Sequence, residues 1–128
     1  MVFTQVPVTK NDEIEGPIPT VWRPLFSSVV DCFVKKDYQI SGGIEGVSSI
    51  STETARHIKD YIQDYGERLI PLPDETWESS VCIYMGNHWD VLIDLWTVGE
   101  GRSDLVLGAQ VSEIDRGYVV DIGTVYVP

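Results

Sequence analysis

The fold is decided by the segment His88–Leu107, which reads H-W-D-V-L-I-D-L-W-T-V-G-E-G-R-S-D-L-V-L. Apolar side chains recur at every second residue over Trp89–Thr97, which is the period of a strand with one face in the core. The connection Val98–Arg102 is rich in glycine and charge, and a second alternating run begins at Ser103. The segment therefore predicts a β-hairpin at the centre of a sheet.

Strand patterns continue on both sides of this hairpin. We expect four consecutive strands, at Ser80–Met85, His88–Thr97, Ser103–Glu113 and Tyr118–Val127. The pair Gly86-Asn87 suits a two-residue hairpin turn because both residues tolerate positive φ. Short connections between consecutive strands predict an antiparallel meander.

Helical patterns come earlier in the chain. Apolar residues recur at spacings of three and four over Val21–Asp37, and Pro24 is tolerated only in a first turn, so this helix begins near Arg23. A second helix is expected over Thr52–Tyr65, where Ser51 can cap the start. We predict an α+β fold with two N-terminal helices packed on a four-stranded antiparallel meander.

The first 20 residues interrupt both patterns. Turn and breaker residues fill Lys10–Glu13 and Gly16–Pro19. We predict an N-terminal arm over residues 1–20, with one edge strand as an open alternative, followed by a single α+β domain over residues 21–128.

Charge narrows the classes of partner. The formal net charge is -11, and residues 71–128 contribute -8 of it against -3 from residues 1–70. An acidic surface repels nucleic acid and anionic membranes and attracts basic proteins. No signal-peptide core and no run of ~20 apolar residues is present, so we expect a cytoplasmic location.

The central hairpin also concentrates acidic residues. Asp90 and Asp94 share one face of a strand, but their backbones are ~13 Å apart, too far to share a proton directly. Asp94 could meet Asp104 across the hairpin, with Glu100 in the turn. We expect Arg102 to bind one of these acids through its planar fork of donors and so to fix the turn. The predicted structural residues are Arg102, Gly99 and Gly101.

Recognised catalytic and ligand motifs are missing. The glycines at 42, 43 and 46 lack the spacing of a phosphate-binding loop, and no EF-hand spacing occurs. Cys82 has apolar neighbours and no nucleophile context, and a disulfide with Cys32 stays open. We assign no catalytic residue, no metal site and no cofactor.

Two tryptophans lie among acids in the sequence. Trp77 follows Asp74-Glu75, and Trp96 shares a strand face with Asp90 and Asp94. An aromatic ring beside acids suits a basic protein partner, although the helices or the arm could instead cover Trp96. The predicted partner-binding residues are Trp77, Asp90, Asp94, Trp96, Glu100 and Asp104.

Four stretches resemble a small bacterial domain family of unknown function. They are P-L-P-D-E-T-W-E-S-S-V at 71–81, W-D-V-L-I-D-L-W-T at 89–97, E-G-R-S-D-L at 100–105 and V-Y-V-P at 125–128. The resemblance covers roughly residues 45–128 and implies no activity. By size and acidity the chain is also similar to immunity proteins of contact-dependent inhibition and other polymorphic toxin systems, which occlude basic nuclease toxins.

These observations favour a bacterial binding protein, with a basic protein such as a toxin domain as partner. One alternative is a small-molecule or metal-dependent enzyme that uses Asp94, Glu100, Asp104 and His88. Another is a homo-oligomeric module, such as a homodimer paired through a sheet edge or an exposed aromatic.

Overall fold

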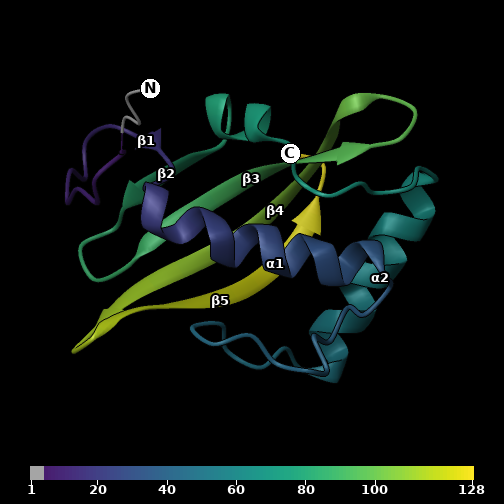
Figure 1. Ribbon diagram of the computed structural model, residues 1–128, viewed down its shortest axis with the longest axis horizontal. Coiled ribbons are helices and arrows are strands. Elements are labelled where there is room, and N and C mark those ends of the chain that lie inside the picture. Colours follow the sequence, from purple (N-terminus) through teal and green to yellow (C-terminus); the bar gives the residue numbers. More distant parts are fainter. Residues whose placement is uncertain (1–4) are drawn as a thin grey trace.

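Five antiparallel strands form the sheet, in the order of the chain. The computed structural model describes residues 5–128. The elements are β1 (Gly16–Pro17), a 3₁₀ turn η1 (Thr20–Trp22), α1 (Arg23–Val34), α2 (Thr52–Tyr65), a 3₁₀ turn η2 (Asp74–Glu78), β2 (Val81–Tyr84), β3 (Trp89–Thr97), β4 (Gly101–Ile114) and β5 (Gly117–Tyr126). In Figure 1, α1 lies across one face of the sheet and α2 lies toward one end.

The α+β class, the two helices and the antiparallel meander are confirmed, but the predicted number of strands is wrong. The additional strand, β1, belongs to the predicted arm and pairs with Cys82 and Val81 of β2. Two residues are too few to show a period, and Gly-Pro usually marks a break. Proline is nevertheless tolerated at a sheet edge because its missing N–H can face away from the ladder. The first four residues of the arm lie outside the described part of the chain.

Both helices begin and end for local reasons. The Ser51 hydroxyl accepts a hydrogen bond from the Thr54 amide at the start of α2, and Gly66 ends the helix at φ 86°. The bounds of α2 match the prediction. The first helix begins at Arg23 as expected, with Pro24 in its first turn, and ends at Val34, short of the predicted Asp37.

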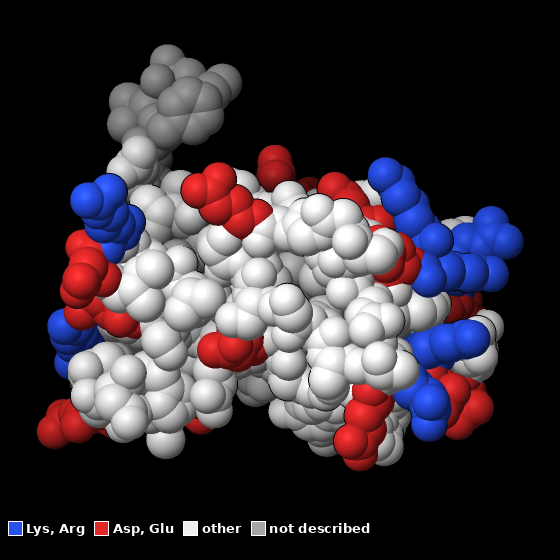
Figure 2. All heavy atoms as spheres, turned by 90° about the horizontal axis from the view of Figure 1, so that it is seen from below, with Lys and Arg blue, Asp and Glu red and all other residues white. Residues whose placement is uncertain are grey.

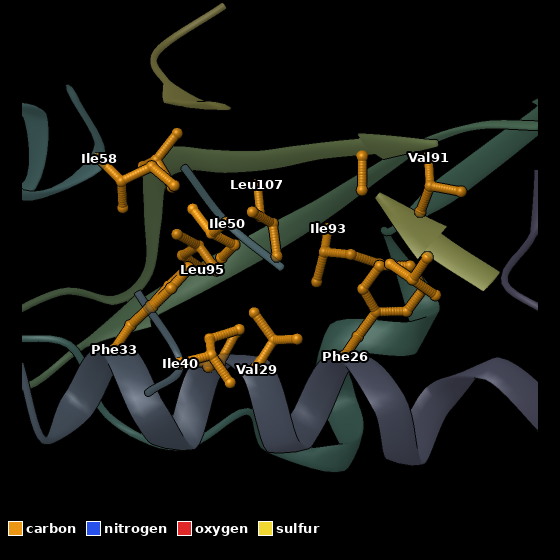
Figure 3. Packing of buried hydrophobic residues seen from close by; sticks show 14 of the residues in the cluster. Phe26, Val29, Phe33, Ile40, Ile50, Ile58, Val91, Ile93, Leu95 and Leu107 are labelled. Atoms are coloured by element: carbon orange, nitrogen blue, oxygen red, sulfur yellow. The ribbon is translucent and has the colours of Figure 1, made fainter. Parts of the chain in front are cut away.

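The core lies between the helices and one face of the sheet. Figure 3 shows Phe26, Val29 and Phe33 of α1 pointing toward side chains of the central strands. Val91, Ile93 and Leu95 of β3 are each at most 1% exposed, which confirms that this set faces the core. At ~25 cal/mol per Å² of buried apolar surface, this layer is the main favourable contribution to folding.

Loops and the arm add contacts around the sheet. Val47 forms a parallel bridge with Val120 of β5, and Leu69 forms an antiparallel bridge with Thr97 of β3. The Trp89 indole N–H donates to the Thr9 carbonyl at 2.8 Å, which fastens the arm to the sheet. Within residues 5–128, no helix is long and apolar enough to cross a membrane.

Candidate functional site

The face of the sheet opposite the helices carries a hollow of about 600 Å³. Side chains alternate between the two faces of a strand, so Leu92 points to this open face while Val91 and Ile93 point into the core. We call this depression the open-face hollow. Its side chains come from Glu15, Val81, Ile83, Asp90, Leu92, Gln110, Asp121, Thr124 and Tyr126, around Gly108 and Gly123.

Cross-strand register explains the shape of the hollow. Leu92 of β3, Gly108 of β4 and Thr124 of β5 are neighbours in one row. Gly108 has no side chain, so the row has an empty position above its backbone, bordered by Leu92, Thr124 and the Tyr126 ring. A register shift next to Gly108 gives β5 one extra residue.

A polar row borders the empty position. Asp90 of β3, Gln110 of β4 and Asp121 of β5 are paired neighbours across the sheet. Paired Cα atoms in antiparallel strands lie about 4.5–5.5 Å apart, so the two carboxylates flank the Gln110 amide. Glu15 adds a third acid to the lining.

The lining of the open-face hollow contains no Lys or Arg. In the view of Figure 2, basic side chains lie toward the two ends of the molecule, while acidic side chains also occur across its middle. At one end, Lys36, Arg56 and Lys59 line a shallow groove between the end of α1 and the start of α2. The hollow is therefore an acidic and apolar site, separated from this basic groove.

Asp90 is partly engaged within the protein. Its Oδ1 lies 3.0 Å from His88 Nε2, and His88 Nδ1 lies 2.6 Å from Asn87 Oδ1. The Asp90 side chain is 45% exposed, and its second oxygen faces no hydrogen-bond donor within residues 5–128. Of the predicted partner-binding residues, Asp90 is the one that lines the hollow.

Asp94 lies in a cluster of hydroxyl groups that joins η2 to β3. The Ser79 hydroxyl donates to Asp94 Oδ2 at 2.5 Å, and the Ser80 hydroxyl accepts from the Asp94 amide at 3.0 Å. The buried Thr76 hydroxyl donates to the Asp94 carbonyl at 2.7 Å. Asp94 therefore has a structural role in the protein, in addition to its predicted role in partner binding.

Glu100 and Asp104 are brought together by a helix residue. The Tyr65 hydroxyl donates to Glu100 Oε1 at 2.8 Å and accepts from the Asp104 amide at 3.1 Å. The Glu100 amide also donates to the Thr97 hydroxyl. The Asp104 amide lowers the pKa of the Tyr65 hydroxyl, but Glu100 and partial burial outweigh it, so this pKa is raised. Helix α2 thus fastens the β3–β4 turn.

The expected bridge from Arg102 is wrong. Within residues 5–128, Arg102 makes no ion pair with a carboxylate. Its side chain is exposed, and its backbone is paired with Trp96 across β3 and β4. The turn glycines do contribute: Gly101 has φ 71°, and a Cβ on Gly99 would lie 2.8 Å from Glu67 Oε2. The turn is held by the tyrosine and by close packing, which spacing along one hairpin does not reveal.

The two predicted anchor tryptophans are both half-buried. Trp77 packs against the core beneath the Arg23 guanidinium, which lies 5.4 Å from its ring centroid. Trp96 lies on β3 opposite Arg102, and its indole N–H is buried without a hydrogen-bond partner in the described structure. Trp77 contacts Arg23 of α1, so it does not form one surface with Asp90. Trp96 lies on the same face of β3 as Asp90, outside the lining of the hollow.

The alternative enzymatic cluster is not assembled. His88 precedes β3 and Glu100 follows it, so at ~3.3 Å per residue the nine-residue strand keeps these side chains far apart. Within residues 5–128, no group of three or more His, Cys, Asp or Glu side chains is placed to hold a metal ion.

Both cysteines are free thiols. Cys82 faces the β1 side of the sheet, where its Sγ donates to the Pro17 carbonyl. Burial raises the pKa of the Cys82 thiol to about 11 and also raises the pKa of Cys32. Such thiols are poor nucleophiles at neutral pH.

Most residues of the open-face hollow could not be predicted from the sequence. Asp121, Gln110 and Tyr126 meet Asp90 only through strand register, which no single strand pattern contains. One signal was available: Gly108 interrupts the apolar run Leu105–Ala109, and an isolated strand glycine marks a bulge or a close approach.

The chain belongs to the family described as Domain of unknown function (DUF7668), whose family model matches residues 30–128. This confirms membership of an uncharacterised family, and the match begins inside α1, upstream of the expected residue 45. No curated protein and no solved structure matches the chain significantly.

Proposed function

We propose that this member of the DUF7668 family is a binding module whose open sheet face holds a cationic, partly apolar segment of another protein. The lining of the open-face hollow carries the proposal, because it combines apolar side chains with acids and contains no Lys or Arg. Apolar surface supplies the area that a partner buries, and acids attract and orient a basic partner.

Charge supports this partner class at long and short range. The net charge of -11 increases the rate at which a basic protein encounters the chain. Within residues 5–128, the Asp121 carboxylate makes no ion pair and accepts no side-chain hydrogen bond. A partner cation would therefore replace water there rather than break an existing contact.

The finer proposal is that the partner is a basic toxin domain, which the protein neutralises by covering it, as immunity proteins do. Small size, acidity and an uncovered sheet face support it. In this proposal Asp90, Asp121 and Glu15 contact the toxin. Trp96 and Asp104 remain proposed contacts beyond the hollow.

A defined peptide tests the binding module. We would titrate isotope-labelled protein with a soluble peptide of Lys, Leu and Gly, and with the same peptide carrying Glu for Lys. The expected result is that methyl signals of Val81, Ile83 and Leu92 shift with the Lys peptide only. Because both partners are charged, affinity should fall as ionic strength rises from about 50 to 300 mM.

Two charge-reversal variants supply the control. The double variant Asp90→Lys with Asp121→Lys should weaken Lys-peptide binding at least tenfold. The matched variant Glu53→Lys with Asp64→Lys changes net charge equally on exposed positions of α2, away from the hollow. Equal losses in both variants, or signal shifts confined to α2, would contradict the proposal.

The toxin partner needs its own test. Where the neighbouring gene encodes a basic toxic domain, co-expression with this chain should restore growth, and the variant Asp90→Lys with Asp121→Lys should not. Full rescue by that variant would exclude the open-face hollow as the toxin site.

A further inference from the structure

We infer that the open-face hollow is a socket for one arginine side chain of the partner, with the aliphatic stem over Gly108 and the guanidinium between Asp90 and Asp121. This inference rests on the proposed function and adds the residue type that the site recognises. It follows from three observations. The fold does not require glycine at position 108, apolar side chains lie beside that glycine, and two acids lie about the length of an arginine side chain away from it.

Gly108 is not explained by backbone conformation or crowding. It lies inside the 14-residue strand β4, and its φ is not in the left-handed region. A Cβ there would lie 3.5 Å from Tyr126 Cε1 and 3.6 Å from Thr124 Cγ2, which are ordinary contacts. Alanine would therefore fit, and glycine inside a strand is less stable than alanine because it loses more backbone freedom on folding.

The neighbouring Gly123 differs in this respect. A Cβ on Gly123 would lie 3.2 Å from the Gly108 carbonyl oxygen, so close approach of β4 and β5 favours glycine at that position. Gly108 has no such reason. Its missing side chain leaves the Gly108 backbone in the lining of the hollow, in an empty position bordered by Leu92, Thr124 and the Tyr126 ring.

The walls of the empty position suit an aliphatic stem. Leu92 lies on one side, and the Tyr126 ring lies against the other. Long cationic side chains bury their methylene groups on such surfaces while the charged head stays with polar groups. The hollow, at about 600 Å³, has room for the side chain and the adjoining backbone.

The polar row of Asp90, Gln110 and Asp121 is the next row on the same face of the sheet, two residues along β4 from Gly108. Gln110 is two residues further on β4, about 7 Å away at ~3.3 Å per residue, which is the reach of an arginine side chain. Asp90 and Asp121 flank Gln110, and all three can accept hydrogen bonds. A planar guanidinium with five donors can serve several acceptors at once, whereas a lysine ammonium is a compact point charge.

Three peptides of one framework test the inference. Each is a short Gly- and Leu-containing peptide with Arg, Lys or citrulline at one central position, titrated into the labelled protein. The Arg peptide should bind about tenfold more tightly than the Lys or citrulline peptide, with shifts at the Gly108 and Gln110 amides. Equal affinities for the three peptides would overturn the inference.

Filling the socket gives the second test. The variant Gly108→Leu should lose at least tenfold in Arg-peptide affinity, and the smaller change Gly108→Ala should lose about threefold while raising the melting temperature. The matched control is Gly42→Leu, because Gly42 lies in an exposed loop where an added Cβ would have no neighbouring atom within 4 Å. Wild-type affinity in Gly108→Ala and Gly108→Leu would overturn the inference.

The outcome separates this inference from the proposed function. If the Lys-Leu-Gly peptide binds the open face but Arg, Lys and citrulline peptides are not distinguished, the binding module stands and the arginine socket is wrong. If no peptide shifts any signal on the open face, both are wrong.

Discussion

The hydroxyl of Tyr65 shows how one side chain can replace an expected ion pair. It joins the end of α2 to Glu100 and to the Asp104 amide, at the turn where the sequence predicts that Arg102 binds an acid. A neutral hydroxyl can donate and accept at the same time, while a guanidinium can only donate. The turn therefore needs no buried charge.

Removing this hydroxyl should loosen the turn. We expect Tyr65→Phe to lower the free energy of unfolding by about 1 kcal/mol, since a hydrogen bond contributes about 0.5–1.5 kcal/mol. Hydrogen exchange of the Asp104 amide should become faster, which NMR can measure.

The variant Arg102→Leu is the matched control on the same turn. Because Arg102 makes no ion pair in residues 5–128, its replacement should change stability by no more than about 0.5 kcal/mol. A larger loss in Arg102→Leu than in Tyr65→Phe would contradict this account of the turn.

Cys82 should make stability depend on alkaline pH. Burial raises the pKa of its thiol from 9.0 to about 11, so the folded state favours the neutral form. Below about pH 9 the thiol is neutral in both states and does not affect stability. As the pH rises from about 9 to 11, the thiol ionises more readily in the unfolded state, so the folded state is progressively destabilised. Unfolding free energy measured from pH 8 to 11 should therefore fall more steeply in the wild type than in Cys82→Ala. Parallel curves for the two proteins would disprove the effect.

At the scale of elements, periodicity predicted the helices and the long strands because each repeats its signal over many residues. The bounds of α2 follow from a serine cap and a left-handed glycine, both of which are local. The two-residue strand β1 has no period to detect. The open-face hollow depends on which residues of β3, β4 and β5 are opposite one another, and two register shifts set that alignment. No pattern within a single strand records it.

The docking of η2 on β3 depends on a buried hydroxyl. Thr76 is 0% exposed and donates to the Asp94 carbonyl, which β2 does not reach. We expect Thr76→Val to lower the free energy of unfolding by about 1–3 kcal/mol, because the shape is kept while the donor is lost. Chemical denaturation would measure it.

Ser79→Ala is a useful comparison, since Ser79 is less buried and its hydroxyl bonds only the Asp94 side chain. Ser79→Ala should lower the free energy of unfolding by less than Thr76→Val does. The reverse order would show that the carboxylate, and not the backbone carbonyl, holds η2.

At the scale of the whole molecule, the two faces of the sheet differ in what covers them. One face is covered by α1 and α2 and contains the core, while the other keeps apolar side chains, acids and an empty position beside one another. Stability can thus be concentrated on one side, and the other side can vary its side chains with little effect on the fold.

The arm should contribute to global stability through its contact with Trp89. Deleting residues 1–9 removes the Thr9 carbonyl that the buried indole N–H uses, and an unpaired buried donor costs about 1–3 kcal/mol. The deletion should lower the melting temperature and shift tryptophan fluorescence to longer wavelength. Thr9→Ala keeps the carbonyl and should leave both unchanged; loss of stability in that variant would point to the side chain instead.

The order of elements along the chain has a consequence for synthesis on the ribosome. Both helices precede β2–β5, and the bridge between Val47 and Val120 joins an early loop to the last strand. The apolar faces of α1 and α2 therefore have no sheet to cover until β3, β4 and β5 have left the exit tunnel. A nascent chain that stalls before Val120 would leave these apolar faces exposed to chaperones and proteases. Incomplete chains should therefore be degraded more readily than complete, folded ones.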